Sequence, residues 1–196
     1  FLLLVGPEPD YQWQRFVSAV QHLVVHYDVR LAVGLAGVPW PAPHTRPLGI
    51  TVHGTQADLV QGLALPLGEL QVPGHVTALI ELRLGESGTP SIGVTAQVPH
   101  YLAQVEFPLA ARVLIEGLCS VTGLVLPTDG LQLAVDAAQL QLAEQVAENE
   151  EFATVLSALE QQYDQMAAQT AASSRAFPAP DVLAPGGRVP TGARTS

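Results

Sequence analysis

SIGVTAQVPHY, residues 91–101, sets the architecture of the chain. Ile92 and Val94 are strand formers, and the apolar character of the stretch favours a buried strand. Pro99 lacks the N–H group that a central strand needs, so we expect the strand to end there, just before His100-Tyr101. In open α/β sheets, ligands and partners bind at this carboxyl end of the strands.

Two earlier apolar segments resemble this one, because each precedes a proline-bearing loop with ionisable residues. Leu2–Val5 precedes Gly6-Pro7-Glu8-Pro9-Asp10, and Leu31–Leu35 precedes a loop that ends in His44-Thr45-Arg46-Pro47. If the three strands are parallel, their loops meet at one edge of the sheet, which we call the rim. The residues predicted to form this partner- or ligand-binding rim are Pro7, Glu8, Asp10, His44, Thr45, Arg46, Pro99, His100 and Tyr101.

Composition narrows the class of protein. The 196 residues suffice for one sizeable core, and 48% hydrophobic against 13% charged residues favours a sheet buried on both faces. The net charge of −10 and the absence of lysine argue against nucleic acid and anionic membranes as partners. No apolar run reaches the ~18 residues that span a bilayer. A single cysteine, Cys119, excludes an internal disulfide and a cysteine-based metal site, and we predict neither metal nor cofactor.

Hydrophobic periodicity predicts helices between the strands. The first helix follows Asp10, its expected N-cap, and runs to Tyr27, so that it crosses over between the first two strands in a βαβ unit. The other predicted helices are a short one at Gln56–Gly62, one at His75–Leu84, one that begins at Pro108 and a long helical region after Thr128.

A further strand is predicted at Leu48–His53, where polar and apolar residues alternate. Only a loop joins it to Leu31–Leu35, and strands joined without a helix are usually antiparallel. The sheet is therefore predicted to be mixed but mostly parallel, within a three-layer α/β domain.

The C-terminal helical region carries two apolar stripes on either side of the acidic run Glu148-Asn149-Glu150-Glu151. The run is either a tight turn in a helical hairpin or the solvated middle of one long helix. The region is either an arm for a partner or two ordinary helices that pack on the sheet. The stripes are Leu131, Val135, Ala138, Leu142 and Val146, then Phe152, Val155, Leu156, Leu159, Tyr163 and Met166.

The predicted boundaries are one α/β domain at 1–168 and a disordered tail at 169–196, where Ala, Ser, Pro, Gly and Arg occur without period. The domain opens on an apolar strand with no lead-in, which would be an unprotected edge. We therefore expect that sequence precedes Phe1.

An enzymatic alternative uses the same rim. His44 and His100 would act as general base and acid, and the planar guanidinium of Arg46 would hold a phosphate or carboxylate. These parts suit a small-molecule hydrolase or a phosphorylase. The chain lacks the spacings of a nucleophile elbow, a P-loop, a dinucleotide fingerprint or a zincin motif. We therefore favour a rigid structural loop cluster or a binding rim, and we assign no catalytic residue.

Several motifs together resemble the bacterial, actinobacterial-type branch of the proteasome assembly chaperone 2 family, over about residues 1–164. They are Gly6-Pro7-Glu8-Pro9-Asp10-Tyr11 with Trp13 and Phe16, Gly37-Val38-Pro39, Pro43-His44-Thr45-Arg46-Pro47, Val72-Pro73-Gly74, Gln97-Val98-Pro99-His100-Tyr101 with Pro108, and Leu159-Glu160 with Tyr163-Asp164.

The resemblance implies a nucleoside-phosphorylase-like α/β fold in a cytoplasmic protein. Eukaryotic relatives chaperone assembly of the proteasome α-ring, and archaeal relatives engage proteasomes. The resemblance thus implies a non-enzymatic interaction or assembly-chaperone-like protein, with proteasome subunits among its candidate partners. The chain ends Gly192-Ala193-Arg194-Thr195-Ser196, without the hydrophobic-Tyr-X tail by which such relatives dock. The apolar excess further favours a homo-oligomer.

Overall fold

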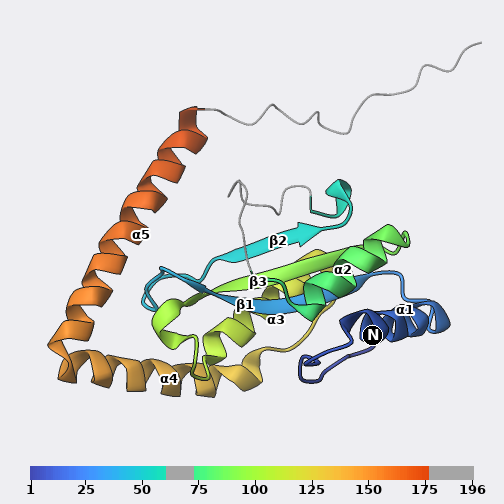
Figure 1. Cartoon of the computed structure of the whole chain (residues 1–196). Helices are drawn as coiled ribbons and strands as arrows, with labels where there is room; N and C mark the ends of the chain where they lie inside the picture. The colour runs from blue at the N-terminus through green and yellow to red at the C-terminus, as the bar shows by residue number, and fades with distance from the viewer. Residues whose placement is uncertain (61–72, 177–196) are drawn as a thin grey trace, which may run out of the picture.

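The computed structural model describes residues 1–60 and 73–176. Within these ranges the strands form one three-stranded sheet in the order β1-β3-β2 (Figure 1). β3 (Ser91–Pro99) lies in the centre, parallel to β1 (Ala32–Trp40) and antiparallel to β2 (Ile50–Gly54). The mixed α/β sheet predicted from the sequence is thus confirmed, and so is the end of the central strand at Pro99.

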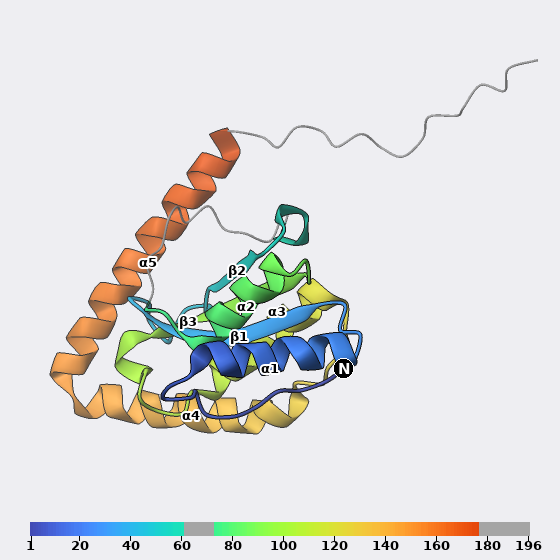
Figure 2. The ribbon, with the colours of Figure 1, turned by 45° about the vertical axis from the view of Figure 1, so that its right-hand side comes forward.

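Helices cover both faces of the sheet (Figures 1 and 2). α2 packs on β1 and β3 with α1 outside it, whereas α3 packs on all three strands from the other face and contacts α4. The layers predicted from the sequence are therefore present. The helices are α1 (Trp13–His26), η1 (Ala57–Val60), α2 (Val76–Glu86), η2 (His100–Leu102), α3 (Pro108–Thr122), α4 (Asp129–Glu148) and α5 (Glu150–Ala176).

The core lies between the sheet and α3. Val52, Ile92 and Val94 are buried there, with side chains of α3 packed against them. Close approach depends on a glycine, because a Cβ on Gly117 of α3 would lie 3.0 Å from Val94 and 3.1 Å from Ile50. This packing fixes β3, so its carboxyl end is a rigid base for the residues that follow.

β1 continues to Trp40, beyond the predicted end at Leu35, so the prediction of a loop from Ala36 onward is wrong in part. The strand tolerates Pro39 because β1 is an edge strand, in which a missing N–H group on the open side costs no ladder bond. β1 and β2 run in opposite directions as predicted, but they are not neighbours, because β3 lies between them.

The predicted strand at Leu2–Val5 is wrong for this structure. No described segment pairs with it, and its side chains are between 61% and 79% exposed. The βαβ crossover through α1 is therefore absent as well. Asp10 is not the N-cap of α1, because the chain turns through the left-handed region at Gln12, with φ 60°, while the Trp13 indole N–H donates to the Pro9 carbonyl at 2.6 Å.

The C-terminal helices meet at a corner, which we call the elbow (Figure 1). α4 begins directly after Thr128, as predicted, and the break falls at Asn149. The Asn149 side-chain oxygen accepts the Phe152 N–H at 3.0 Å, so it caps a new helix. The result is neither a hairpin nor one long helix. α5 runs to Ala176, past the predicted start of the tail, and residues 177–196 lie outside the described ranges.

Candidate interaction site

The rim is built where the parallel strands β1 and β3 end side by side. Trp40 pairs with Pro99, so the loop after β1 lies beside η2. This register brings His44 of the loop against Tyr101 of η2, as the shared-edge argument predicts.

His44 is held by the Tyr101 hydroxyl through two hydrogen bonds of 2.9 Å. The hydroxyl accepts the His44 backbone N–H and also bonds Nδ1 of its ring. His44 is only 9% exposed, and burial lowers the pKa of its imidazole, which keeps the ring neutral. Burial likewise raises the pKa of Tyr101, which keeps the hydroxyl protonated.

An aromatic contact brings α5 to this pair. The Phe152 ring lies edge-on to Tyr101, with centroids 5.2 Å apart, and is stacked on His44 at 6.3 Å. His100 is exposed, and its ring meets Tyr101 edge-on at 5.3 Å. The first turn of α5 is thus fixed to the carboxyl end of the sheet.

A second set of contacts, which we call the α5 clamp, joins residues 45–47 of the loop to residues 160–164 of α5. Nε and Nη2 of Arg46 each donate to one oxygen of Asp164 at 2.9 Å, and Nη1 donates to Glu160 at 3.3 Å. Thr45 also donates to Glu160, and the Tyr163 hydroxyl donates to the Pro47 carbonyl at 3.2 Å. The Arg46 fork lowers the pKa of Asp164, and the Asp164 carboxylate raises the pKa of Arg46.

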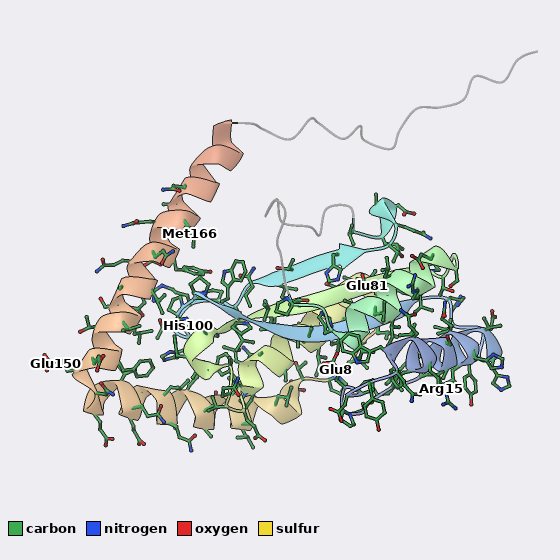
Figure 3. All side chains as sticks on the ribbon, in the orientation of Figure 1. Glu8, Arg15, Glu81, His100, Glu150 and Met166 are labelled. Atoms are coloured by element: carbon green, nitrogen blue, oxygen red, sulfur yellow. The ribbon has the colours of Figure 1, made fainter. Side chains whose placement is uncertain are left out.

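The N-terminal residues predicted for the rim do not join it. The Glu8 carboxylate accepts the Val76 N–H at the start of α2, and Figure 3 shows Glu8 well apart from His100. Asp10 and Pro7 belong to the same segment and form no hydrogen bond or ion pair with the loop after β1. The structure thus gathers His44, Thr45, Arg46 and the residues 99–101, and leaves residues 7–10 elsewhere.

A hollow of about 420 Å³, which we call the elbow pocket, opens next to the rim. Rings of the aromatic cluster form part of its wall, together with the apolar side chains of Leu102 and Val155. Its polar lining comes from the end of α4 and the start of α5: Gln145, Asn149 and Glu151.

Comparison with known proteins places this geometry in a family. The profile of the PAC2 family matches residues 1–146. This chain belongs to the PAC2 family. A Mycobacterium tuberculosis protein of unknown function is 40% identical, with a TM-score of 0.83 over 89% of this chain and 60% of its own. A Corynebacterium glutamicum protein of unknown function is 36% identical, with a TM-score of 0.77 over 84% of this chain and 61% of its own.

A more distant structure shows the PAC2 fold alone. It is a Mycobacterium tuberculosis proteasome-assembly chaperone homologue, 23% identical, with a TM-score of 0.68 over 77% of this chain and 64% of its own. This chain spans about three fifths of the length of the first two relatives. Comparison with functionally curated proteins gives no match.

The rim of this PAC2 protein does not assemble the set that the enzymatic alternative requires. That set needs two histidines and Arg46 around one hollow. The guanidinium is already paired with two carboxylates, His44 Nδ1 is bonded to Tyr101, and neither histidine lines the elbow pocket. Among the described residues no three His, Cys, Asp or Glu side chains gather to hold a metal ion. None of the helices in these ranges could cross a membrane.

Sequence reasoning did not assign Glu160, Asp164 and Phe152 to the site. The first two stand at i and i+4, so both carboxylates share one face of α5, and an acidic pair at this spacing is the available signal for an arginine partner. Their partner Arg46 lies more than a hundred positions earlier in the chain, and no local pattern identifies it.

A separate ionic pair lies over the sheet on its α2 side. Nε2 of His53 on β2 is 3.0 Å from a carboxylate oxygen of Glu81 on α2, and this hydrogen bond raises the pKa of His53. The pair sits above Gly93 of β3, where a Cβ would meet the His53 ring. It joins α2 to the β2 edge of the sheet.

Proposed function

We propose that this protein is a cytoplasmic, non-enzymatic member of the PAC2 family that binds a protein partner through the helices α4 and α5 on either side of the elbow, in an assembly-chaperone-like role. Family membership supports the role, and so does the shared fold of a relative described as a proteasome-assembly chaperone homologue. The family relationship also supports the narrower proposal that the partner is a proteasome subunit.

The observation that carries the proposal is the α5 clamp. Arg46 and Thr45, the groups best suited to hold a small anionic substrate, are engaged by the carboxylates of α5. Because of the clamp, these rim residues are not free to bind a substrate. They instead hold α5 in a position where it projects away from the sheet (Figure 1). A long helix held in this way presents its outer surface to a partner.

Part of the exposed surface of α4 is apolar, in addition to its buried stripe. The inner stripe is buried at Val135 and Leu142, as predicted. Leu133 and Leu140, seven positions apart and hence on one helix face, are 81% and 68% exposed. Together with the exposed Ala137 they form what we call the outer α4 stripe. Exposed apolar side chains in register on one face are typical of a helix that binds another protein.

Affinity capture from native lysate of the source organism tests this proposal. The wild type is compared with Leu133→Glu/Leu140→Glu and with a control, Gln139→Glu/Gln141→Glu, that adds the same charge at exposed neighbours. A defined protein recovered at near-stoichiometric yield with the wild type and the control, but not with the leucine variant, supports the proposal. Equal recovery by all three, or none by any, contradicts it.

The proteasome-related part is tested separately with purified proteasome α- and β-subunits. A mobility shift in native gels with either subunit, lost in Leu133→Glu/Leu140→Glu, supports it. Sedimentation of the isolated protein tests the proposed homo-oligomer: an assembly that dissociates in the same variant implicates the outer α4 stripe.

A further inference from the structure

The elbow pocket is an open hollow with a rigid aromatic wall. Tyr101 and Phe152 are fixed edge to face, and His44 stacks on Phe152 behind them. Leu102 is buried, whereas Val155 is 43% exposed at the mouth. A volume of about 420 Å³ falls in the range of ~300–1,000 Å³ that is typical of ligand sites. The pocket can therefore take a large side chain.

The charge around the pocket favours a cation. Glu151 is exposed, and its carboxylate forms no hydrogen bond or ion pair with another described residue. The lining contains no arginine, and the neutral His44 ring stacks on Phe152.

The C-terminal end of α4 also favours a cation in the pocket. α4 spans 20 residues and has no basic residue in its last turn, so its negative carbonyl end lacks a cation of its own. The positive N-terminus of α5 is already satisfied, because Asn149 caps it and two glutamates lie in its first turn. A cation in the pocket would complete the α4 end, and the Glu151 carboxylate offsets the positive N-terminus of α5 beside it.

We propose that the elbow pocket binds an arginine side chain of the protein partner, an assignment that rests on the proposed function. The aliphatic stem packs against Leu102 and Val155, and the guanidinium lies against the Phe152 ring. Its donors reach the Glu151 carboxylate and the Gln145 side-chain oxygen. Arginine fits better than lysine because a planar guanidinium stacks on a ring while its edge still donates hydrogen bonds.

The probe that tests this is N-acetyl-arginine methylamide, compared with its uncharged isostere N-acetyl-citrulline methylamide. We expect the arginine probe to shift the amide NMR signals of Gln145, Phe152 and Val155 in a saturable manner at millimolar concentration. The citrulline probe should bind at least about fivefold more weakly, because it lacks the charge that Glu151 pairs with. Equal binding of both probes, or shifts that map to other surfaces, would overturn the assignment.

Substitutions at the pocket sharpen the test. Glu151→Gln should weaken the arginine probe about threefold, in keeping with a single exposed ion pair. Val155→Arg places a guanidinium inside the pocket from its own helix and should abolish binding. Ser157→Arg, which adds the same charge at an exposed position of α5 outside the lining, should leave the affinity unchanged. If Val155→Arg retains wild-type affinity, the proposal is wrong.

The same variants separate this proposal from the proposed function. Partner capture that survives Val155→Arg, together with no probe binding to the wild type, refutes the arginine site and leaves the interaction role intact. Probe binding to the pocket without any captured partner refutes the interaction role instead. Loss of both capture and probe binding in Val155→Arg, with Ser157→Arg unaffected, supports both.

Discussion

Tyr101→Phe removes one oxygen atom from the joint between the sheet and the loop after β1. That oxygen accepts the His44 backbone N–H and bonds Nδ1 of the same residue, each at 2.9 Å. The ring contacts with Phe152 remain in the variant, because phenylalanine keeps the same aromatic shape. The substitution therefore isolates the two hydrogen bonds from the packing around them.

The loss of stability in this variant follows from the burial of His44, which is only 9% exposed. An ordinary hydrogen bond contributes ~1 kcal/mol net, and a buried donor left without a partner costs ~1–3 kcal/mol. Tyr101 itself is half-buried, so water can replace part of the loss. We expect the free energy of unfolding to fall by about 2 kcal/mol, which corresponds to about 4–8 °C in Tm for a chain of this size.

Urea denaturation measures the total loss in the free energy of unfolding, and amide hydrogen exchange shows where in the chain the loss occurs. Exchange of the His44 amide should accelerate about 30-fold, the factor that corresponds to ~2 kcal/mol. Tyr163→Phe is the matched control, because its exposed hydroxyl makes one bond of 3.2 Å and its loss should cost less than about 0.5 kcal/mol. Equal effects of the two variants, or unchanged protection at His44, would refute the reasoning.

Three other outcomes are expected. Arg46→Gln should raise hydrogen exchange in the middle of α5 without affecting α1, because it removes the fork that holds α5 to the loop; unchanged exchange would show that the aromatic contacts suffice. Burial lowers the folded-state pKa of His44 and the Arg46 fork lowers that of Asp164, so the stabilising effect is fully present above pH 6.5 for His44 and above pH 3.8 for Asp164, and each is lost as pH falls through the lowered pKa. Stepwise acidification followed by hydrogen exchange should therefore loosen α5 before the sheet unfolds, and simultaneous loss would contradict this. Gly93→Ala should displace the His53 ring from its carboxylate partner and return its raised pKa towards the ordinary value, which an NMR titration measures.

Much of the sheet was predictable because its signals are local. The central strand follows from strand formers that end at a proline, and the helix start at Pro108 follows from the tolerance of proline in a first turn. The inner stripe of α4 was predictable for the same reason. Val135 and Leu142 recur on one helix face and are buried as expected.

The errors occur where pairing over distance decides the outcome. Leu2–Val5 has the apolar character of a strand, yet a strand needs a hydrogen-bonded neighbour, and none is present among the described residues. Asp10 has the right chemistry for an N-cap, but the Trp13 indole bond to Pro9 draws the turn to Gln12. The residue types of a segment cannot reveal either constraint, because each depends on which residues the segment contacts in the folded chain.

Part of the site was predictable from the parallel order of the strands. Parallel strands end together, so His44 and Tyr101 were expected at one edge and do lie there. What those residues contact could not be read from the sequence, since Arg46 is as compatible with a phosphate as with the carboxylates of Asp164. Only the fold of α5 across the loop decides between these partners.

Phe152 links the two surfaces on which the proposals rest. Its ring contacts His44 and Tyr101 in the aromatic cluster, and it also lines the elbow pocket. The α5 clamp holds the same helix about two turns further on, through Glu160 and Asp164. A side chain that binds in the pocket would therefore contact a helix that is fixed at two points. We expect the α5 wall of the pocket to keep its shape when the side chain binds. Because both attachments weaken when their groups bind protons, the pocket should be well formed at neutral pH and lose its shape in acid, before the core that Val94 belongs to is affected.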